Sequence, residues 1–320
     1  MRYLVVGLGS VGGLVAARLA ANGEEVLAVR RPGSTGGSGS TTLTVISAGG
    51  RLTVEVPALA GWDELTPGSG DVVLLCVKSQ STPDVLSAVG AHAPGVPIVC
   101  IQNGVENERS ALRVLPWVAG GLLLCPVTQL EPGVVRSHSW PTSGVLDIGR
   151  YPEGPDVLAT TVAADLASAG FSSRAVTDIM RWKYGKLLSN VLNAVDALCG
   201  WSSRGGELAD LVVNEAKLCL QAAGIDAVPS DELRERSRGV ADYTAVEGVE
   251  FSGSSTAQSL QRGAGSAEVD FLNGEICLLG RLHGIPTPAN ARVQDVCNKM
   301  AARGQAPGTV DEETLLRSLR

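Results

Sequence analysis

Apolar residues follow different patterns in the two halves of the chain. The first half contains short continuous apolar runs, with helical spacing between several of them, at residues 3–6, 25–29, 72–77, 97–101 and 121–127. Runs of this length are typical of strands that are buried on both faces, as in a parallel sheet covered by helices. The pattern therefore predicts a βαβ domain in the first half.

The second half has the spacing of longer helices. Before it begins, β-branched and apolar stretches predict extra strands, a closing helix and a short last strand, at residues 134–149, 156–169 and 171–176. After Asp178 the helical segments are 179–198, 207–224, 228–241, 267–283 and 288–303. We therefore predict an α/β protein with a Rossmann-type parallel-sheet domain at residues 1–177 and a second, all-helical domain at residues 178–320.

The bulk composition fits a soluble two-domain protein. A chain of 320 residues is too long for one typical compact core and suits two domains of ordinary size. With 26 Lys and Arg against 33 Asp and Glu, it lacks the basic surface that binds nucleic acid. The apolar runs are strand-sized, far short of the roughly 20 residues of a membrane span. Met1 leads directly into the first strand and leaves no room for a cleavable signal, so a cytoplasmic location is expected.

The cysteines and histidines predict neither disulfides nor a metal site. The cysteines occur singly and without a CxxC pair, at positions 76, 100, 125, 199, 219, 277 and 297. His92, His138 and His283 share no metal-binding spacing. We interpret the cysteines as reduced residues packed in the core.

A glycine-rich turn directly follows the first predicted strand. It reads GxGxxG, with the residues Gly7, Leu8, Gly9, Ser10, Val11 and Gly12. In a dinucleotide-binding turn the first glycine allows the tight turn, the second allows close approach of a pyrophosphate, and the third allows helix and strand to pack closely. The motif alone is weak in a chain with 39 glycines, and a purely structural turn is the alternative. Its place between strand and helix, at the start of a βαβ unit, favours a dinucleotide site.

Two arginines end the second predicted strand. Arg30 and Arg31 stand where a domain that binds NAD usually has an acidic residue for the ribose hydroxyls. Guanidinium groups suit the 2′-phosphate of NADP, although a solvated basic loop would look the same. Residues 33–40 are rich in Gly and Ser, so we expect a loop that is mobile without ligand and becomes ordered when NADPH binds.

Several short runs occur in a specific order along the whole chain. After the glycine-rich turn come Cys76-Val77-Lys78-Ser79, Gln102-Asn103-Gly104, Trp182-Lys183-Tyr184-Gly185-Lys186-Leu187, Ser254-Ser255, Glu268-Val269-Asp270-Phe271-Leu272-Asn273-Gly274 and His283-Gly284-Ile285-Pro286. In this order and spacing the chain resembles the ketopantoate reductase family, relatives of the 6-phosphogluconate dehydrogenase-like oxidoreductases. The resemblance implies NADPH-dependent reduction of a 2-oxo acid to a 2-hydroxy acid, with ketopantoate as the first substrate to test.

The resemblance also implies roles for individual residues. Lys186 is implied to be the catalytic acid, and Glu268 the carboxylate that organises the substrate side. Lys78 and Asn103 are implied to line the nicotinamide end of the cofactor. The residues implied to hold the substrate are Asn103, Asn190 and Ser255.

Two departures from the family pattern bear on the substrate pocket. The second substrate-binding asparagine of the family falls at Ala194, and Asn193 lies one place earlier as its replacement. The segment from Gln258 to Glu268 is one residue longer than the pattern. Both departures leave room for another 2-oxo or 3-hydroxy acid as the substrate.

The residue chemistry gives partial support to the catalytic assignment. Hydride delivery to a carbonyl builds negative charge on oxygen, and a lysine supplies both a proton and positive potential there. At about 100° per residue, Lys186, Asn190 and Asn193 fall within about 60° on one helix face, opposite an apolar face. An amphipathic helix with a solvated stripe would give the same split, and Lys183 lies near this face too.

The other candidates also have simpler interpretations. Glu268 precedes an apolar helix face, where a buried carboxylate must pair, but it could also favour a helix N-terminus capped by Ser266. Glu275 shares that face. Lys78 and Asn103 follow apolar strands, at the edge where α/β sheets bind ligands, although isolated polar loop residues are common.

The expected partner is therefore a small-molecule 2-oxo acid, with neither nucleic acid nor membrane involved. A homodimer is compatible with the sequence. A nucleotide-binding sensor without catalysis is the alternative from a different class, and the presence of both Lys186 and Glu268 argues against it.

Overall fold

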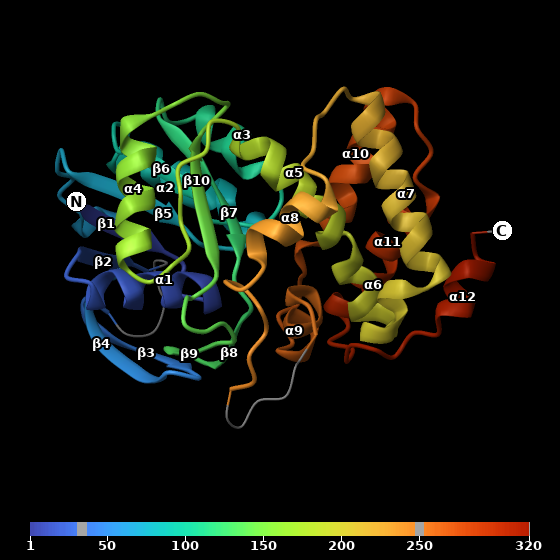
Figure 1. Ribbon diagram of the computed structural model, residues 1–320, viewed down its shortest axis with the longest axis horizontal. Coiled ribbons are helices and arrows are strands. Elements are labelled where there is room, and N and C mark those ends of the chain that lie inside the picture. Colours follow the sequence, from blue (N-terminus) through green and yellow to red (C-terminus); the bar gives the residue numbers. More distant parts are fainter. Residues whose placement is uncertain (31–36, 247–252, 320) are drawn as a thin grey trace. The chain divides into compact units, whose positions relative to one another are not determined.

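The computed structural model describes residues 1–30, 37–246 and 253–319 and divides into two compact units (Figure 1). The sheet unit comprises Met1–Met180 and Asp231–Val249, and the helical unit comprises Arg181–Ser230 and Glu250–Arg320. The predicted fold class, a Rossmann-type α/β domain with a helical one, is confirmed. The segment that starts at Asp231, which the sequence analysis assigned to the helical domain, is part of the sheet unit. Arg31 and residues 33–36 lie outside the described residues.

One mixed sheet forms the centre of the sheet unit. Its strands are β1 (Arg2–Val6), β2 (Glu25–Val29), β3 (Gly39–Ser47), β4 (Gly50–Leu59), β5 (Asp71–Leu75), β6 (Ile98–Cys100), β7 (Val118–Leu124), β8 (Val127–Glu131), β9 (Val134–Ser137) and β10 (Val145–Arg150). They lie in the order β10-β7-β6-β5-β1-β2-β4-β3-β9-β8. The five strands predicted from continuous apolar runs are neighbours and pair in parallel, from β2 through β1, β5 and β6 to β7.

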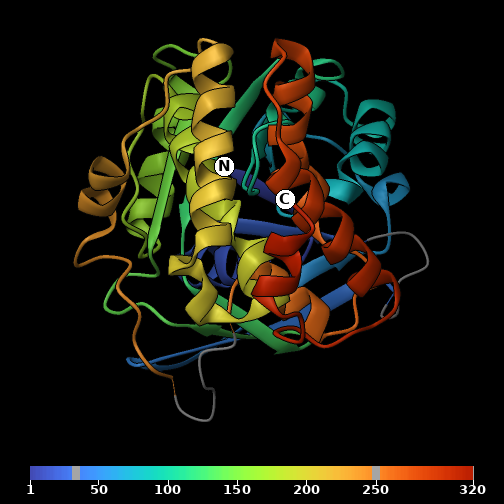
Figure 2. The same ribbon diagram turned by 90° about the vertical axis from the view of Figure 1, so that its right-hand side faces the viewer.

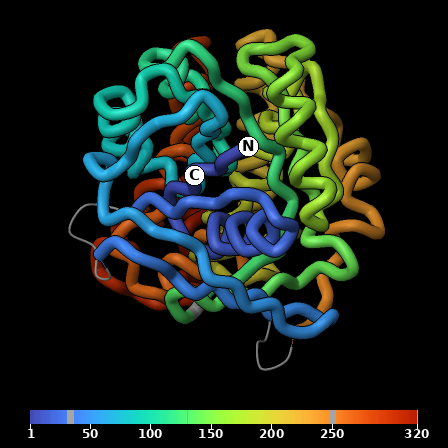
Figure 3. Tube along the Cα trace, turned by 90° about the vertical axis from the view of Figure 1, so that its left-hand side faces the viewer, coloured from blue at the N-terminus to red at the C-terminus, as the bar shows by residue number. Residues whose placement is uncertain are grey.

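Helices cover both faces of this sheet because the inner strands carry apolar side chains on both faces, and these must be buried. Along β1, Tyr3 and Val5 belong to one core, and Leu4 and Val6 belong to another. Residues of α1 (Ser10–Ala21) and α4 (Val157–Ser168) join the first core, and Figure 3 shows the blue coil of α1 against the strands. Residues of α2 (Thr82–His92) and α3 (Asn107–Leu112) join the second.

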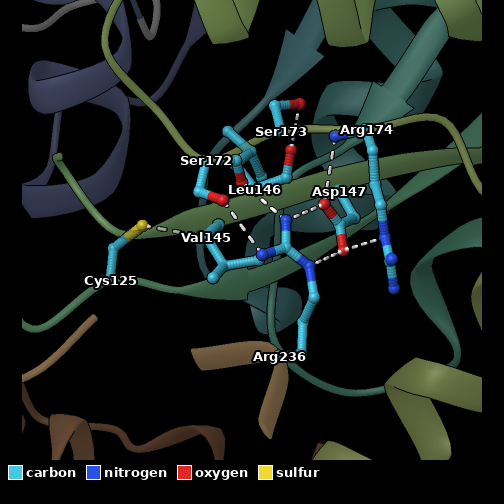
Figure 4. A network of polar contacts seen from close by, with 8 residues as sticks. All are labelled: Cys125, Val145, Leu146, Asp147, Ser172, Ser173, Arg174 and Arg236. Carbon is cyan, nitrogen blue, oxygen red and sulfur yellow. Dashed lines mark hydrogen bonds and ion pairs between the residues drawn. The ribbon is translucent and has the colours of Figure 1, made fainter. Parts of the chain in front are cut away.

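A buried ion pair holds the segment after Ser230 on the sheet unit. Arg236 in α8 (Ser230–Ser237) donates to both carboxylate oxygens of Asp147 on β10, at 2.8 and 2.6 Å (Figure 4). The same guanidinium donates to the Ser172 hydroxyl at 2.9 Å, and Arg174 lies 3.5 Å from the carboxylate. Asp147 is 0% exposed, so its charge requires these partners. The pair explains why a helix encoded between helical-unit segments folds onto the sheet.

The helical unit packs α7 (Glu207–Ala222) side by side with α10 (Asn273–His283) and α11 (Pro288–Ala302), as Figure 2 shows. The unit also contains α5 (Ile179–Asn190, from Arg181 onward), α6 (Leu192–Cys199), α9 (Ser255–Gln261), α12 (Glu312–Arg317) and the 3-10 turns η3 (Trp201–Gly205) and η4 (Glu268–Phe271). No helix in the described parts of the chain has the length and apolarity needed to cross a membrane.

Two predicted helices are interrupted. The segment predicted as one helix over 179–198 breaks at Val191, and the segment predicted over 267–283 breaks at Leu272. All seven cysteines lie in the described residues and are unpaired. Four of them are buried as predicted, and three are half-buried, namely Cys76, Cys125 and Cys199. Burial raises the pKa of Cys76 and of Cys297 to about 12, so both are neutral in the folded protein.

Candidate active site

The glycine-rich turn has the stereochemistry of a dinucleotide-binding turn. Gly7 has φ +95, a backbone conformation that side chains disfavour, and a Cβ at Gly12 would lie 1.9 Å from the Gly7 carbonyl oxygen. A Cβ at Gly9, the residue that precedes α1, would meet nothing within 4 Å. The first and third glycines thus permit the close packing of turn and helix. The second leaves open space beside a helix N-terminus, where a pyrophosphate would be stabilised.

Arg30 directly follows β2 and therefore lies at the carboxyl edge of the sheet. Its Nη1 donates to the Gly37 carbonyl at 2.9 Å and its Nη2 to the Ser40 carbonyl at 3.4 Å. The guanidinium therefore braces the start of β3, and because arginine has five N–H donors it has others for a further acceptor. Arg31, its predicted partner, lies outside the described residues.

Lys78 and Asn103 occupy equivalent places on adjacent parallel strands. Leu75 ends β5, pairs with Cys100 at the end of β6, and lies three residues before Lys78, as Cys100 does before Asn103. Both side chains are half-buried. The structure thus places these two predicted cofactor residues on neighbouring loops, at the carboxyl edge of the sheet.

A buried network of neutral groups ties these two loops together. The Gln102 amide donates to the Val77 carbonyl at 2.7 Å and to the Thr82 hydroxyl at 2.9 Å. Thr82 in turn donates to the Asn107 amide oxygen at 2.8 Å, and Asn107 donates to the Asn103 carbonyl at 3.1 Å. Gln102 belongs to one of the sequence motifs, whereas Thr82 and Asn107 had no predicted role. The only sequence feature that could have indicated Thr82 and Asn107 is their position, since each is a polar residue that begins the helix following an apolar strand.

In the helical unit, α5 carries Lys186 and Asn190. Lys186 is half-buried, whereas Lys183, one turn earlier, is only 4% exposed. Asn190 is the last residue of α5, and Asn193 lies in the first turn of α6. The three predicted polar residues therefore flank the break at Val191 instead of lying on one continuous helix.

Asn193 and Ser255 are brought together, as the assignment of both to the substrate requires. The Asn193 amide nitrogen lies 3.5 Å from the Ser255 hydroxyl, and the Ser254 hydroxyl donates to the Asn193 carbonyl at 3.1 Å. Asp196 accepts from the Ser254 backbone N–H at 2.6 Å and so fixes the start of α9. Ala194 is buried.

Glu268 opens the 3-10 turn η4 and is 8% exposed. The residue that precedes this turn is Ala267, without a side-chain cap, so the interpretation with Ser266 as the N-cap of a helix is wrong. Glu275 is also buried but belongs to the next helix, α10. Asp270, two residues after Glu268, accepts from Gln294 and Asn298 at 2.7 Å on the exposed side.

A second buried network holds the break between α5 and α6. The Asn273 amide donates to the Val191 carbonyl at 3.0 Å and to the Asn290 amide oxygen at 3.0 Å. Asn290 donates to Glu215 at 2.8 Å, and that carboxylate accepts from the backbone of Ala289 and so caps the start of α11. Asn273 belongs to one of the sequence motifs, but its role could not be predicted because its partner Val191 is 82 residues away in the sequence.

Comparison with known proteins decides the family. The description "Ketopantoate reductase PanE/ApbA" matches residues 3–153, and "Ketopantoate reductase PanE/ApbA C terminal" matches residues 178–301. The chain belongs to the ketopantoate reductase family. Members of this family are oxidoreductases that depend on a nicotinamide dinucleotide, and this chain is such an enzyme.

Individual relatives span nearly the whole chain. A 2-dehydropantoate 2-reductase from Halobacterium salinarum is 29% identical over 316 residues, which is 92% of this chain and 97% of the relative. The crystal structure of a PanE/ApbA family ketopantoate reductase from Ralstonia eutropha is 28% identical, with a TM-score of 0.76 over 95% of this chain and 99% of that one. A D-mandelate dehydrogenase solved with NADH and anilino(oxo)acetate has the same fold at 17% identity, with a TM-score of 0.76 over 95% and 99%.

Proposed function

We propose that this member of the ketopantoate reductase family uses NADPH to reduce ketopantoate to pantoate. The observation that carries the proposal is the match to a protein named 2-dehydropantoate 2-reductase over 92% of this chain and 97% of the relative. The family descriptions match residues 3–153 and 178–301, which include the glycine-rich turn and the helical residues proposed for catalysis.

The cofactor is proposed to lie along the carboxyl edge of the sheet. Gly9 leaves space for the pyrophosphate at the start of α1. Arg30 and Arg31 are proposed to bind the 2′-phosphate that distinguishes NADPH from NADH. Lys78 and Asn103 are proposed to line the nicotinamide end.

The reaction needs a proton donor next to the substrate carbonyl. When bound, NADPH would supply the hydride for the carbonyl carbon, so residues beside the substrate would have to stabilise the negative charge on the carbonyl oxygen. We assign Lys186 as the group whose Nζ stabilises this charge and donates the proton. Glu268 is assigned to orient Lys186 and the substrate, and Asn190, Asn193 and Ser255 to hold the substrate.

A related 2-oxo or 3-hydroxy acid is the second candidate substrate. The observation that favours it is Ala194, a buried methyl group where the family pattern has a substrate-binding asparagine. The loss of one amide changes the hydrogen bonds that a pocket can offer, and such differences decide between similar substrates.

A substrate panel tests the proposal. The full chain is assayed for loss of NADPH absorbance with ketopantoate and a series of other 2-oxo acids, and for the appearance of NADPH from NADP⁺ with a series of 3-hydroxy acids. The product is identified by mass spectrometry. We expect ketopantoate to give the highest kcat/KM, on the order of 10⁴ M⁻¹s⁻¹ or above. A higher kcat/KM for another acid would support the second candidate, and no turnover with any acid would indicate a nucleotide-binding sensor. The cytoplasmic location and a homodimer stay predictions.

A further inference from the structure

Arg204 lies against the residues assigned to the substrate. It belongs to the 3-10 turn η3, directly after α6. Its Nη1 donates to the Asn193 amide oxygen at 3.3 Å, and its Nη2 donates to the Ser189 carbonyl at 3.4 Å. The amide nitrogen of the same Asn193 side chain lies 3.5 Å from the Ser255 hydroxyl. The guanidinium therefore lies beside the break between α5 and α6.

The positive charge of Arg204 has no ion-pair partner among the described residues. The guanidinium carbon lies over the Trp201 ring, 4.7 Å from the ring centroid, and Arg204 is half-buried. Burial lowers the pKa of Arg204, but a guanidinium remains protonated in proteins. Asp196 contributes attraction from a distance, and its own Oδ2 is already bonded to the Ser254 N–H at 2.6 Å.

A half-buried cation of this kind fits an anionic ligand. Its two hydrogen bonds to neutral protein oxygens are long, at 3.3 and 3.4 Å, whereas bonds from an arginine to a carboxylate are shorter, at about 2.7–2.9 Å. A 2-oxo acid carries a carboxylate directly next to the carbonyl that is reduced. The guanidinium fork matches the two oxygens of that group.

We propose that Arg204 binds the carboxylate of the 2-oxo acid substrate, with Asn193 and Ser255 beside it. This inference rests on the proposed function and adds to it the residue that selects acids over neutral carbonyl compounds. Because the carboxylate keeps its charge throughout the reaction, Arg204 binds the substrate and the transition state about equally. Its loss should therefore raise KM and leave kcat nearly unchanged.

The experiment compares Arg204→Met with Arg204→Lys, on ketopantoate and on its neutral methyl ester. For Arg204→Met we expect KM for the acid to rise roughly 10- to 100-fold, with kcat within about threefold and NADPH affinity unchanged. The KM for the ester should stay within about twofold of the wild-type value, and Arg204→Lys should recover part of the loss. Arg292→Met is the matched control, because Arg292 is a partly exposed arginine on α11 that pairs with Asp295.

A second measurement requires no turnover. Calorimetry gives the Kd of pantoate, the 2-hydroxy acid, for the NADP⁺-loaded chain, and Arg204→Met should weaken it by the same factor. If the wild-type chain binds pantoate without reducing ketopantoate, the proposed function fails and the Arg204 comparison still stands. Equal losses for acid and ester would show that Arg204 only positions Asn193. Unchanged KM and Kd, or no pantoate binding by the wild-type chain, would also overturn the proposal.

Discussion

The two units hold their proposed functional groups in different ways. In the sheet unit the proposed cofactor site depends mainly on the backbone: glycines that allow close packing, the N-terminus of α1, and two loops joined by a neutral network around Gln102 and Asn107. In the helical unit the site depends on side chains that flank a break in a helix, held by Asn273. We therefore expect substitutions at the site in the sheet unit to impair it mainly by steric clash. Substitutions at the site in the helical unit should impair it mainly by loss of hydrogen bonds.

The largest effect is expected within the glycine-rich turn, where two glycines differ in available space. A Cβ at Gly12 would lie 1.9 Å from the Gly7 carbonyl oxygen, so Gly12→Ala should displace α1, lower the melting temperature and abolish measurable NADPH binding. Binding is measured by fluorescence titration and stability by thermal unfolding.

Gly9→Ala is the matched control for this comparison. Because its Cβ meets nothing within 4 Å, the variant should unfold at the wild-type temperature while NADPH affinity falls at least about tenfold, by obstruction of the pyrophosphate. If Gly9→Ala bound NADPH normally, the pyrophosphate would not lie where we place it.

The buried ion pair should give the largest loss of stability that does not involve a clash. Asp147→Asn leaves Arg236 without a charged partner in a buried place, and breaking a buried pair costs about 3–5 kcal/mol of unfolding free energy. Urea denaturation measures this loss. The exposed Asp295→Asn, which also breaks ion pairs, should cost less than about 1 kcal/mol. Equal costs for the two variants would refute a role for burial.

A neutral network should give a smaller loss than the ion pair. Asn273→Ala leaves the Val191 carbonyl and the Asn290 amide oxygen without their donor, which costs about 1–3 kcal/mol. Since the break at Val191 places Asn190 and Asn193, kcat should fall as well. Asn298→Ala removes an amide bonded to exposed Asp270 and should change neither quantity. A normal kcat for Asn273→Ala would show that the break does not position the site.

The smallest effect is expected for cofactor choice. Arg30→Ala should reduce the preference for NADPH over NADH roughly tenfold, because a charge-assisted phosphate contact contributes on the order of 1.5–3 kcal/mol and Arg31 remains. The ratio of the two dissociation constants measures it. An unchanged ratio would mean that Arg30 serves only to brace the Gly37 and Ser40 carbonyls.

The five inner strands β2, β1, β5, β6 and β7 could be predicted because each contains a continuous apolar run, which burial of both faces of the sheet requires. The hairpin of β3 and β4 gave no such run: along β4, exposed and half-buried residues alternate up to Glu55, and the sequence analysis assigned no strand there. The Gly/Ser stretch that it assigned to a loop partly overlaps the start of β3 at Gly39. Alternation over a half-exposed strand is a weaker signal than a continuous apolar run.

The break at Val191 could not be predicted from helical periodicity. Leu187, Val191 and Val195 are all buried, so the apolar spacing continues across the break. The group that satisfies the Val191 carbonyl is Asn273, 82 residues away, and only the tertiary structure brings them together. The resemblance to the family indicated which residues to examine, but it assigned no role to Asn273 and did not include Arg204.

We assign Lys186 as the residue that donates the proton and stabilises the developing alkoxide. The most direct test is the steady-state kinetics of Lys186→Ala with ketopantoate, together with a titration of NADPH. We predict that kcat falls by about 10²–10⁴ while the Kd of NADPH stays nearly unchanged, because the interaction strengthens only in the transition state. Lys183→Ala should lower kcat much less. Normal turnover by Lys186→Ala, or a larger kcat defect in Lys183→Ala, would contradict the assignment.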